Sequence, residues 1–340
     1  MSILSKKIPV IYTLILALIL SGLSFIALKK LTNNPASASE QYQSGKYNDQ
    51  NCDLSMSRLK GYTYIQPLVA VTKDCESENL VPLKNDITSL IENEKKAGEI
   101  TTASVFIKQF STAQWTSVNL EERFLPGSLF KLPILYTILK MSENDPSFLN
   151  KKIVYDPKAV VTLKQTYETR SVKPGQTYTI KELLTYMIAY SDNNATQLLT
   201  ANMDPDILIK VFDDLGLTKP DPRNYLSYTI SPRDYSIFMN ALYNAAYLNI
   251  NNSEFATSLL AQCNFTDGLV KGLPSNTKIA HKFGEAGIDD AHELHETGIV
   301  YLNNNAYLVT VMTRGNDLKK LSYTISEISA KVYAYMSQHS

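Results

Sequence analysis

The chain has 340 residues, long enough for one large domain or two medium ones. Hydrophobic residues make up 44% of it and charged residues 19%, so the chain can bury a sizeable core and is not disordered as a whole. Its 33 basic and 33 acidic side chains balance, but four lysines and no acid lie within the first 30 residues, so the remainder carries 29 basic against 33 acidic side chains. We expect no nucleic-acid partner, because such a partner requires a basic surface.

Residues 8–28 form a nearly unbroken apolar run without a charge, and a pair of lysines lies on either side of it. The run is long enough to cross a bilayer as a helix. Residues 1–30 are therefore predicted to be a single-pass membrane anchor or a signal peptide cleaved near Ala38. We favour the anchor, because the candidate cleavage site lies far beyond the apolar run. In both cases the rest of the chain is expected at the extracytoplasmic face of the cell membrane.

Residues 31–50 are rich in Asn, Ser, Ala and Gln and are predicted to be a flexible linker, followed by one domain over 51–340. The three cysteines fit an exported protein. Cys52 and Cys75 flank a strand-like apolar run and are a disulfide candidate; the alternative is two free buried thiols. Cys263 ends a helical pattern and is expected in the core.

The next elements are predicted from periodicity and turn residues. Residues 85–97 are expected to form a helix, residues 101–110 and 115–118 two strands, and residues 111–114 the turn between them. An almost wholly apolar segment follows Ser128 and continues to Met141, which indicates a buried helix. Pro133 removes one backbone hydrogen bond there, so a local kink is expected.

A helical block comes next. Thr179 and Glu182 form a capping box that opens a helix to residue 190, and Ser231 followed by Pro232 opens another to residue 246. A further helix is expected over 253–262. Strands are predicted at 278–284, 298–302 and 306–314, with a hairpin turn at 303–305. A last helix is marked by apolar residues at 318, 321, 325, 328 and 332.

This order predicts an α+β fold. An antiparallel sheet of about five strands is flanked by N- and C-terminal helices and interrupted by an all-helical subdomain over about 128–264. A cleft between the two parts is the natural place for a site.

Ser128 and Lys131 lie three residues apart at the predicted start of the buried helix, so their side chains share one face. A serine hydroxyl is a poor nucleophile unless a base takes its proton. A lysine can be that base only when neutral, a form favoured by burial and by a second cation, for which Lys282 is the candidate. N–H groups at the helix N-terminus can stabilise an oxyanion. The alternative is an N-cap serine followed by a surface lysine.

Two further motifs follow at wide spacing. In Ser191-Asp192-Asn193, Ser191 would relay a proton to the leaving nitrogen, Asn193 would hydrogen-bond the substrate amide, and Asp192 would hold the loop. Because Ser, Asp and Asn are good N-cap residues, the motif could also be a plain helix start.

The third motif, Lys282-Phe283-Gly284, lies on a predicted strand. Lys282 would supply positive charge for a substrate carboxylate, and Gly284 would let a substrate backbone approach closely. The N–H of Glu285 would be a second oxyanion donor. The alternative is an ordinary edge strand.

The three motifs in this order resemble those of the class A β-lactamase and penicillin-binding serine hydrolase family. The resemblance covers most of residues 52–340, including Thr229–Pro232 and Gly298–Tyr301. It implies a β-lactamase/transpeptidase-like fold with the Ser128 helix at the subdomain boundary. It also implies that Ser128 is acylated by a β-lactam or a peptide amide carbonyl.

The sequence departs from that pattern at two points. Class A relatives carry a glutamate that activates water to free the acyl-enzyme, but this chain has no glutamate from residue 183 to 253. Asp221 is the least implausible substitute. Phe283 replaces a threonine that in relatives donates a hydroxyl to the substrate carboxylate, so that donor is lost and the ring is expected to narrow the site. Acylation is therefore expected, and rapid turnover is not.

Other chemistries have weaker support. His292 and His295 resemble a zinc motif only superficially, because a metalloprotease helix requires His-Glu-x-x-His. A polar turn between strands is the preferred interpretation, and we expect no metal and no cofactor. A triad that uses His281 would lack a nucleophile-elbow motif.

Three functions remain open. The first is a membrane-anchored serine hydrolase, expected to be monomeric, that acts on β-lactams or related amides. The second is a cell-wall D,D-peptidase or transpeptidase that uses the same motifs on peptidoglycan-like peptides. The third is a binding module that keeps the fold without turnover.

Overall fold

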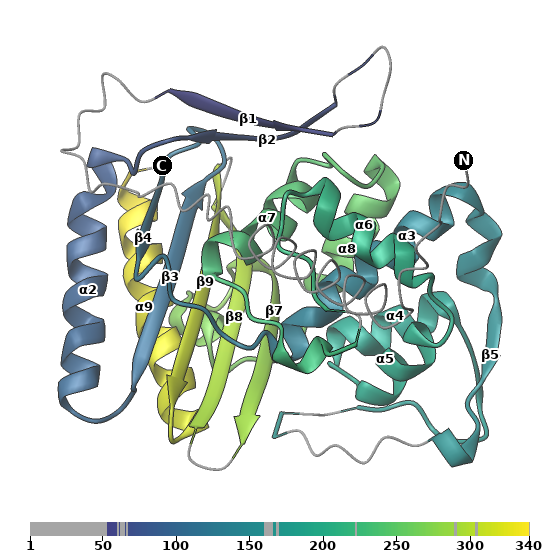
Figure 1. The fold of residues 1–340 in the computed structure, drawn as a ribbon. Coiled ribbons are helices and arrows are strands. Elements are labelled where there is room, and N and C mark those ends of the chain that lie inside the picture. The colour runs from purple at the N-terminus through teal and green to yellow at the C-terminus, as the bar shows by residue number, and fades with distance from the viewer. Residues whose placement is uncertain are drawn as a thin grey trace, which may run out of the picture. The chain divides into compact units, whose positions relative to one another are not determined.

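The computed structural model describes residues 53–339, except 60, 62–64, 66, 160–165, 168–169, 222, 289–290 and 303–304. Its centre is an antiparallel five-stranded sheet in the order β4-β3-β9-β8-β7 (Figure 1). The strands are β3 (Thr102–Gln109), β4 (Trp115–Val118), β7 (Lys278–Ile288), β8 (Ala291–Leu302) and β9 (Asn305–Gly315). The predicted α+β fold class is confirmed, and β7 is an edge strand.

Helices cover the sheet on both faces. The helices α2 (Val81–Lys96) and α9 (Leu318–Gln338) lie on one face, at the left of Figure 1. On the other side lies the predicted helical block, and α7 contacts β3, β8 and β9. This block consists of α3 (Lys131–Asn144), α4 (Ile180–Ala189), α5 (Asn193–Thr200), α6 (Pro205–Asp214), α7 (Pro232–Tyr243) and α8 (Ile250–Leu260).

Strand alternation divides the core into two layers. Leu308 and Met312 of β9 pack with the helical block, whereas Val309 and Val311 pack with α2 and α9. Successive strand residues point to opposite faces of a sheet, so this central strand is apolar on both sides. The sheet thereby holds the helical block and the outer helices in one body.

Most predicted elements are present, with shifted ends. The capping box of Thr179 and Glu182 and the N-cap of Ser231 are confirmed. On α9, the predicted face is buried at Leu321, Ile325 and two further positions, Ile328 and Val332. The expected hairpin turn at 303–305 lies largely outside the described residues.

The hydrogen bond that Pro133 removes lies at the start of the α-helix. The helix begins as a 3₁₀ turn over Gly127–Phe130 and becomes α-helical at Lys131, so Pro133 falls in the first α turn. The carbonyl that an N–H at this position would have engaged, that of Leu129, accepts a hydrogen bond of 2.8 Å from Tyr235 Oη of α7. A tertiary contact therefore replaces the hydrogen bond that proline removes.

Two small sheets lie outside the central one. Part of the first was predicted as the strand-like run between Cys52 and Cys75, whereas the second interrupts the subdomain that was predicted to be all-helical. One is the hairpin of β1 (Leu54–Arg58) and β2 (Leu68–Lys73), the other pairs β5 (Lys152–Val154) with β6 (Thr177–Thr179). The first hairpin is fastened where Lys108 Nζ donates to Val71 O over 3.0 Å and Trp115 Nε1 donates to Lys73 O over 2.7 Å. The pairing of β1 with β2 and the strands of the second sheet were not predicted, because strands of three to five residues give too short a pattern to identify.

Several predictions concern the cysteines and the N-terminal part of the chain. Cys75 is disulfide-bonded, and Cys263 is a free, buried thiol as expected. Cys52, the predicted partner, and the apolar run 8–28 lie outside the described residues. Among the helices that are described, none has the length and apolar character needed to cross a membrane.

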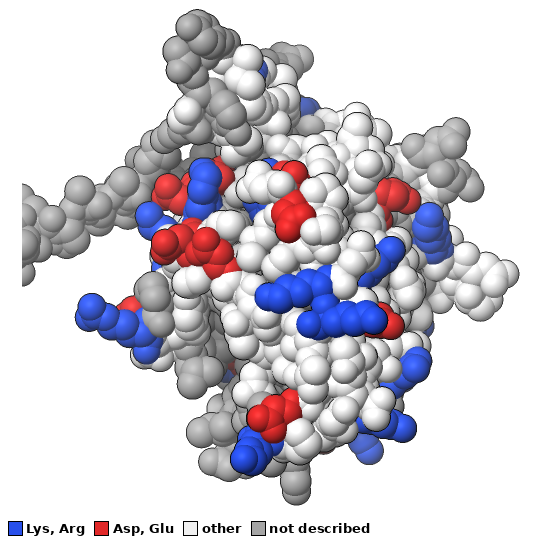
Figure 2. Space-filling view, turned by 90° about the vertical axis from the view of Figure 1, so that its right-hand side faces the viewer, with Lys and Arg blue, Asp and Glu red and all other residues white. Residues whose placement is uncertain are grey.

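Basic and acidic side chains are interspersed on the face of the helical block that Figure 2 shows, and neither sign forms a continuous field there. This distribution agrees with the balanced composition.

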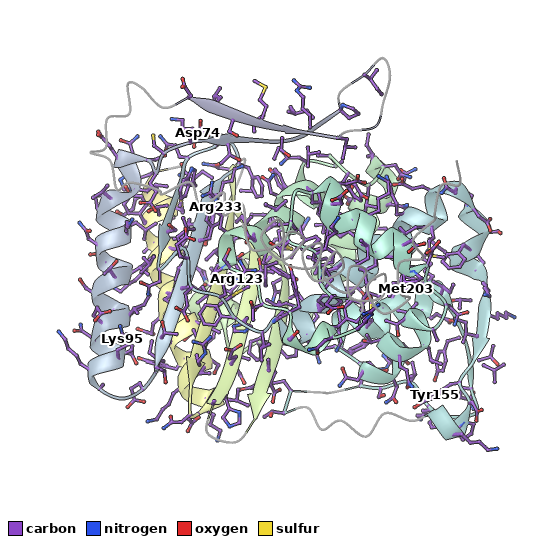
Figure 3. The ribbon with its side chains drawn as sticks, in the orientation of Figure 1. Asp74, Lys95, Arg123, Tyr155, Met203 and Arg233 are labelled. Carbon is purple, nitrogen blue, oxygen red and sulfur yellow. The ribbon has the colours of Figure 1, made fainter. Side chains whose placement is uncertain are left out.

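A buried glutamate fixes the segment that leads to Ser128. Glu293 of β8 accepts hydrogen bonds from Leu125 N over 2.8 Å and from Arg314 Nε over 2.7 Å. Arg314 also donates to Arg123 O over 2.9 Å, and its guanidinium lies over the Phe124 ring. Figure 3 labels Arg123 in this segment, in front of the sheet. Burial opposes the charge of Glu293, but the hydrogen bonds from His295 and Arg314 prevail and lower its pKa.

We expect Arg314→Met to destabilise the fold by about 3 kcal/mol, because it leaves the buried Glu293 carboxylate without its cation. A lowered glutamate pKa adds stability above the pKa of the unfolded chain and loses it as pH falls through the folded value. The defect should therefore shrink toward about pH 3, which urea unfolding at several pH values measures.

The matched control is Lys95→Met. Lys95 lies on α2 (Figure 3) and pairs only with the exposed Glu92 at 2.9 Å. Its loss should change stability by less than about 0.5 kcal/mol at every pH. Equal defects in the two variants would contradict the role assigned to Glu293.

Candidate active site

Ser128 lies on the 3₁₀ turn before α3, and its side chain is half-buried. The turn packs closely against β7. A Cβ on Gly284 would lie 2.5 Å from Pro126 O and 2.8 Å from Leu129 N, so only glycine allows this approach. The sequence predicts that this space admits a substrate backbone. In the structure this space is filled by the chain's own turn Gly127–Phe130, which carries Ser128 and is called the nucleophile turn below.

The Lys131 side-chain nitrogen lies at the centre of the three motifs. Its Nζ is 3.0 Å from Ser128 Oγ, 3.0 Å from Ser191 Oγ and 2.9 Å from Asn193 Oδ1, and it also donates to Ser191 O. The Lys131 side chain is 3% exposed. The residues predicted to be nucleophile, base, relay and amide-binding group are thus brought together.

Ser191 is held in a backbone conformation that non-glycine residues rarely adopt, with φ of 56°. The fully buried Asp192 next to it fastens the loop. Its carboxylate accepts hydrogen bonds from Ser171 Oγ at 2.8 Å and from the N–H groups of Val172 and Asn194 at 2.9 Å each. These three bonds hold the strained conformation that aims Ser191 Oγ between two lysines.

The second of these lysines is Lys282 of β7. Its Nζ donates to Ser191 Oγ over 3.0 Å and to Phe283 O over 2.8 Å, and the side chain is 0% exposed. Burial lowers the pKa of Lys282 to about 8, although the charges of Cys263 and Glu296 act in the opposite direction. Lys282 therefore keeps most of its charge at neutral pH.

Phe283 belongs to an aromatic cluster with Phe265 and Tyr167. Its ring stacks on Phe265 at 4.5 Å between centroids and meets Tyr167 edge-on at 6.0 Å. Lys282 Nζ lies 4.2 Å from the centre of the same ring. The predicted loss of a hydroxyl donor at position 283 is accompanied by a ring that shields the ammonium. The Lys282 ammonium is thus not exposed to make the predicted contact with a substrate carboxylate.

Glu285 follows directly, and its side chain is half-buried at the rim of the site. Its carboxylate accepts hydrogen bonds from Thr166 Oγ1 at 2.6 Å and from Thr166 N at 3.1 Å. The sequence points only to the backbone of Glu285. Thr166, Tyr167 and Phe265 are not found from the sequence, because no local motif marks residues that approach β7 from distant loops.

The arrangement can transfer a proton in one direct path. Lys131 contacts the hydroxyl groups of both Ser128 and Ser191, and Lys282 contacts the second of these. Such a group of side chains can deprotonate a nucleophile and protonate a leaving group without moving.

The predicted substitute for the missing glutamate is less well placed. Asp221 is exposed, and its carboxylate accepts a hydrogen bond of 2.8 Å from Arg223 N in its own turn. Nearby, Tyr225 and Tyr228 pack edge-on against Phe130, with ring centroids 5.8 and 6.0 Å away. Aromatic packing, rather than a carboxylate, connects this segment to the helix after Ser128.

The histidine side chains take part in contacts that stabilise the fold. The predicted polar turn at 292–295 is wrong, because these residues belong to strand β8. His295 Nε2 lies 2.9 Å from Leu125 O, and His281 Nδ1 lies 2.6 Å from the buried Glu296. Within the described part of the chain, no three metal-ligating side chains form a group that could hold a metal ion.

Known proteins resemble most of this chain. A profile of the beta-lactamase enzyme family matches residues 82–336. The chain is 23% identical over 237 residues to beta-lactamase VEB-1 of Pseudomonas aeruginosa, covering 65% of this chain and 79% of that protein. It is 25% identical over 304 residues to a beta-lactamase of Phocaeicola vulgatus, covering 80% and 90%.

Solved structures show the same fold. A point mutant of PBP-A, in an acyl-enzyme complex with penicillin G, superposes with a TM-score of 0.64 at 23% identity, covering 76% of this chain and 97% of that one. A beta-lactamase from Chitinophaga pinensis gives a TM-score of 0.66 at 16% identity, with 75% and 99% covered.

We expect Gly284→Ala to reduce acylation of Ser128 about 100-fold, because displacing the nucleophile turn by even about 1 Å has an effect of that order. The added methyl group should also destabilise the fold by about 2 kcal/mol through overpacking. Rates of active-site labelling and thermal unfolding would measure the two effects.

Gly298→Ala on the neighbouring strand is the control. A Cβ there would meet the side-chain ends of Ile279 and Leu269 at 3.0 Å rather than backbone. It should leave the labelling rate within about threefold of wild type, because those ends can yield. Equal losses in both variants would argue against the role of the close approach.

We expect Lys282→Met to stabilise the fold at pH 7 by up to about 3 kcal/mol while it abolishes rapid acylation. The folded pKa of about 8 lies below the ordinary lysine value of 10.5, so between these pH values the folded chain binds fewer protons than the unfolded chain. Wild-type stability therefore rises with pH in this window, and the advantage of the variant should disappear near about pH 10. Denaturant unfolding at both ends of the window measures this, and a pH-independent difference would sink the prediction.

Proposed function

Because the chain belongs to the beta-lactamase enzyme family, we propose that it is a serine hydrolase acylated on Ser128 by the carbonyl of a β-lactam or a peptide amide. The observation that carries this proposal is the position of Lys131 Nζ, which contacts Ser128 Oγ and Ser191 Oγ at 3.0 Å each.

In the acylation step Ser128 Oγ attacks the carbonyl carbon, and Lys131 Nζ, as the neutral amine, takes the hydroxyl proton. The N–H groups of Ser128 and Glu285 stabilise the oxyanion of the tetrahedral intermediate. The C–N bond then breaks, and the leaving nitrogen takes a proton from Ser191 Oγ. Ser191 in turn receives the proton that Lys131 took. The products are an ester on Ser128 and a free amine.

Two groups prepare this step. Lys282 stabilises the negative charge that develops on Ser191 Oγ as it gives up its proton, because its ammonium is 3.0 Å away and shielded from water. Asn193 keeps Lys131 in line through its Oδ1 at 2.9 Å and lies half-buried, where its amide can reach a substrate.

Release of the acyl group is expected to be slow. Water must be activated by a base within hydrogen-bond reach of the ester. In the described part of the window between Asn193 and Pro232, four of the five acids engage helix caps, surface lysines or their own turns, as Asp221 does. We therefore infer a long-lived acyl-enzyme.

A cell-wall D,D-peptidase or transpeptidase is the second candidate. The absence of a glutamate from residue 183 to 253 favours it, because a transpeptidase needs no dedicated base for water if an amine accepts the acyl group. The similar PBP-A mutant is known as an acyl-enzyme with penicillin G, which agrees with a stable ester.

We also infer that the domain works outside the cytoplasm, anchored by residues 8–28. The disulfide at Cys75 supports this location, because disulfides persist in oxidising compartments. Protease treatment of intact cells would degrade the domain there, and full protection would oppose the inference.

Mass spectrometry of the intact protein after incubation with benzylpenicillin tests the proposed function. We expect one adduct on the wild type and none on Ser128→Ala, and Lys131→Ala should slow adduct formation by about 10²- to 10⁴-fold as the general base is lost. Nitrocefin turnover should be much slower than adduct formation. Release of D-alanine from a peptidoglycan peptide would select the peptidase.

If wild type and Ser128→Ala both remain unlabelled by the β-lactam and by the peptide, the serine-hydrolase proposal fails. A binding module that keeps the fold would then be the better explanation.

A further inference from the structure

The leaving group of the acylation reaction lies on a defined side of the site. In the proposed function, which this inference rests on, the leaving nitrogen takes its proton from Ser191. Ser191 Oγ lies 3.0 Å from Lys282 Nζ, and Lys282 lies against the Phe283 ring. Substituents on the leaving nitrogen therefore face the Lys282–Phe283 side of the site, where β7 runs.

The cation on that side is not available to a substrate. The Lys282 ammonium is surrounded by Ser191 Oγ, Phe283 O and the face of the Phe283 ring, at 3.0, 2.8 and 4.2 Å. The Lys282 side chain is 0% exposed and Phe283 is 3% exposed. Phe283 cannot turn aside easily, because Phe265 and Tyr167 pack on its ring.

Among the described residues, Glu285 places a negative charge at the rim of this side. The Glu285 carboxylate is fixed by two hydrogen bonds from Thr166. Burial raises the pKa of the Tyr167 hydroxyl, and the negative charges of Asp267, Glu285 and Asp317 raise it further. Within the described part of the chain, Lys282 is the cation in contact with the aromatic cluster of Phe265, Phe283 and Tyr167.

A carboxylate placed there would lose its hydration against aromatic rings and lie near the Glu285 carboxylate, and in the described part of the chain the Lys282 ammonium beside these rings is already engaged. We propose that the enzyme acts on amides whose leaving amine carries an uncharged or basic group, rather than a carboxylate, next to the nitrogen. Amidated or internal peptide bonds have this property. Penicillins and free peptide C-termini can still acylate Ser128, but as poor substrates.

The test compares two probes that differ by one charge, benzylpenicillin and its methyl ester. The second-order rate constant for labelling Ser128 is measured by quenched-flow mass spectrometry, and each value is divided by the probe's rate of alkaline hydrolysis. We expect the corrected labelling rate constant of the ester to exceed that of the acid by at least about tenfold. A like-charge contact costs the acid more free energy than a tenfold ratio requires.

Two variants assign the preference to the side chains. Phe283→Thr removes the shielding ring and adds a hydroxyl donor, so the ester-to-acid ratio should fall at least about tenfold. Phe283→Leu, the matched control, stays apolar and adds no donor, so the ratio should stay above unity. Glu285→Gln keeps the hydrogen bonds to Thr166 without the charge and should raise the rate constant of the acid by several-fold. Circular dichroism and thermal unfolding verify that the variants are folded.

The outcomes separate this inference from the proposed function. If the wild type labels Ser128 with the acid as fast as with the ester, the substrate preference is overturned and the acylation proposal stands. The same holds if Phe283→Leu and Phe283→Thr change the ratio equally. If neither probe labels Ser128 although the protein is folded, the proposed function fails and this inference fails with it.

Discussion

The site depends on one hydroxyl placed between two buried lysine nitrogens. Ser191 Oγ lies 3.0 Å from Lys131 Nζ and 3.0 Å from Lys282 Nζ, and the three residues come from a loop of the helical block, from α3 and from β7. Burying two lysine side chains this close is unfavourable unless oxygen atoms surround their nitrogens. The fold supplies those oxygens, and in doing so it fixes the helical block against the edge of the sheet.

Much of the surrounding structure serves this arrangement. Asp192 holds Ser191 in a strained conformation through three hydrogen bonds, and Gly284 lets β7 approach the nucleophile turn to within contact of its backbone. Glu293 and Arg314 fix the segment that enters this turn. The strain and the buried charge lower stability, and the two apolar layers of the sheet are large enough to offset that loss.

The same geometry explains why only half of the proposed reaction has strong support. Acylation needs a nucleophile, a base and a proton donor, and Ser128, Lys131 and Ser191 lie in contact. Deacylation needs a base beside the ester. The segment that could carry one packs Tyr225 and Tyr228 on Phe130, and Asp221 is engaged in an exposed turn. On the opposite side, Phe283 contributes an apolar group and Glu285 an acidic one. These two side chains affect which amide can enter the site.

The order of the elements and the residues of the three motifs could be predicted from the amino-acid sequence, because helix caps, alternation and motif spacing are local signals. The capping box at Thr179 and the apolar face of α9 are examples. The polar stretch at His292 was wrongly predicted as a turn, because a central strand that buries paired polar groups does not show apolar alternation. Which groups share the site became clear only in the folded chain. Three features depend on packing between distant segments, and no local pattern encodes such packing. Phe283 shields Lys282, Thr166 donates hydrogen bonds to Glu285, and the nucleophile turn packs against Gly284.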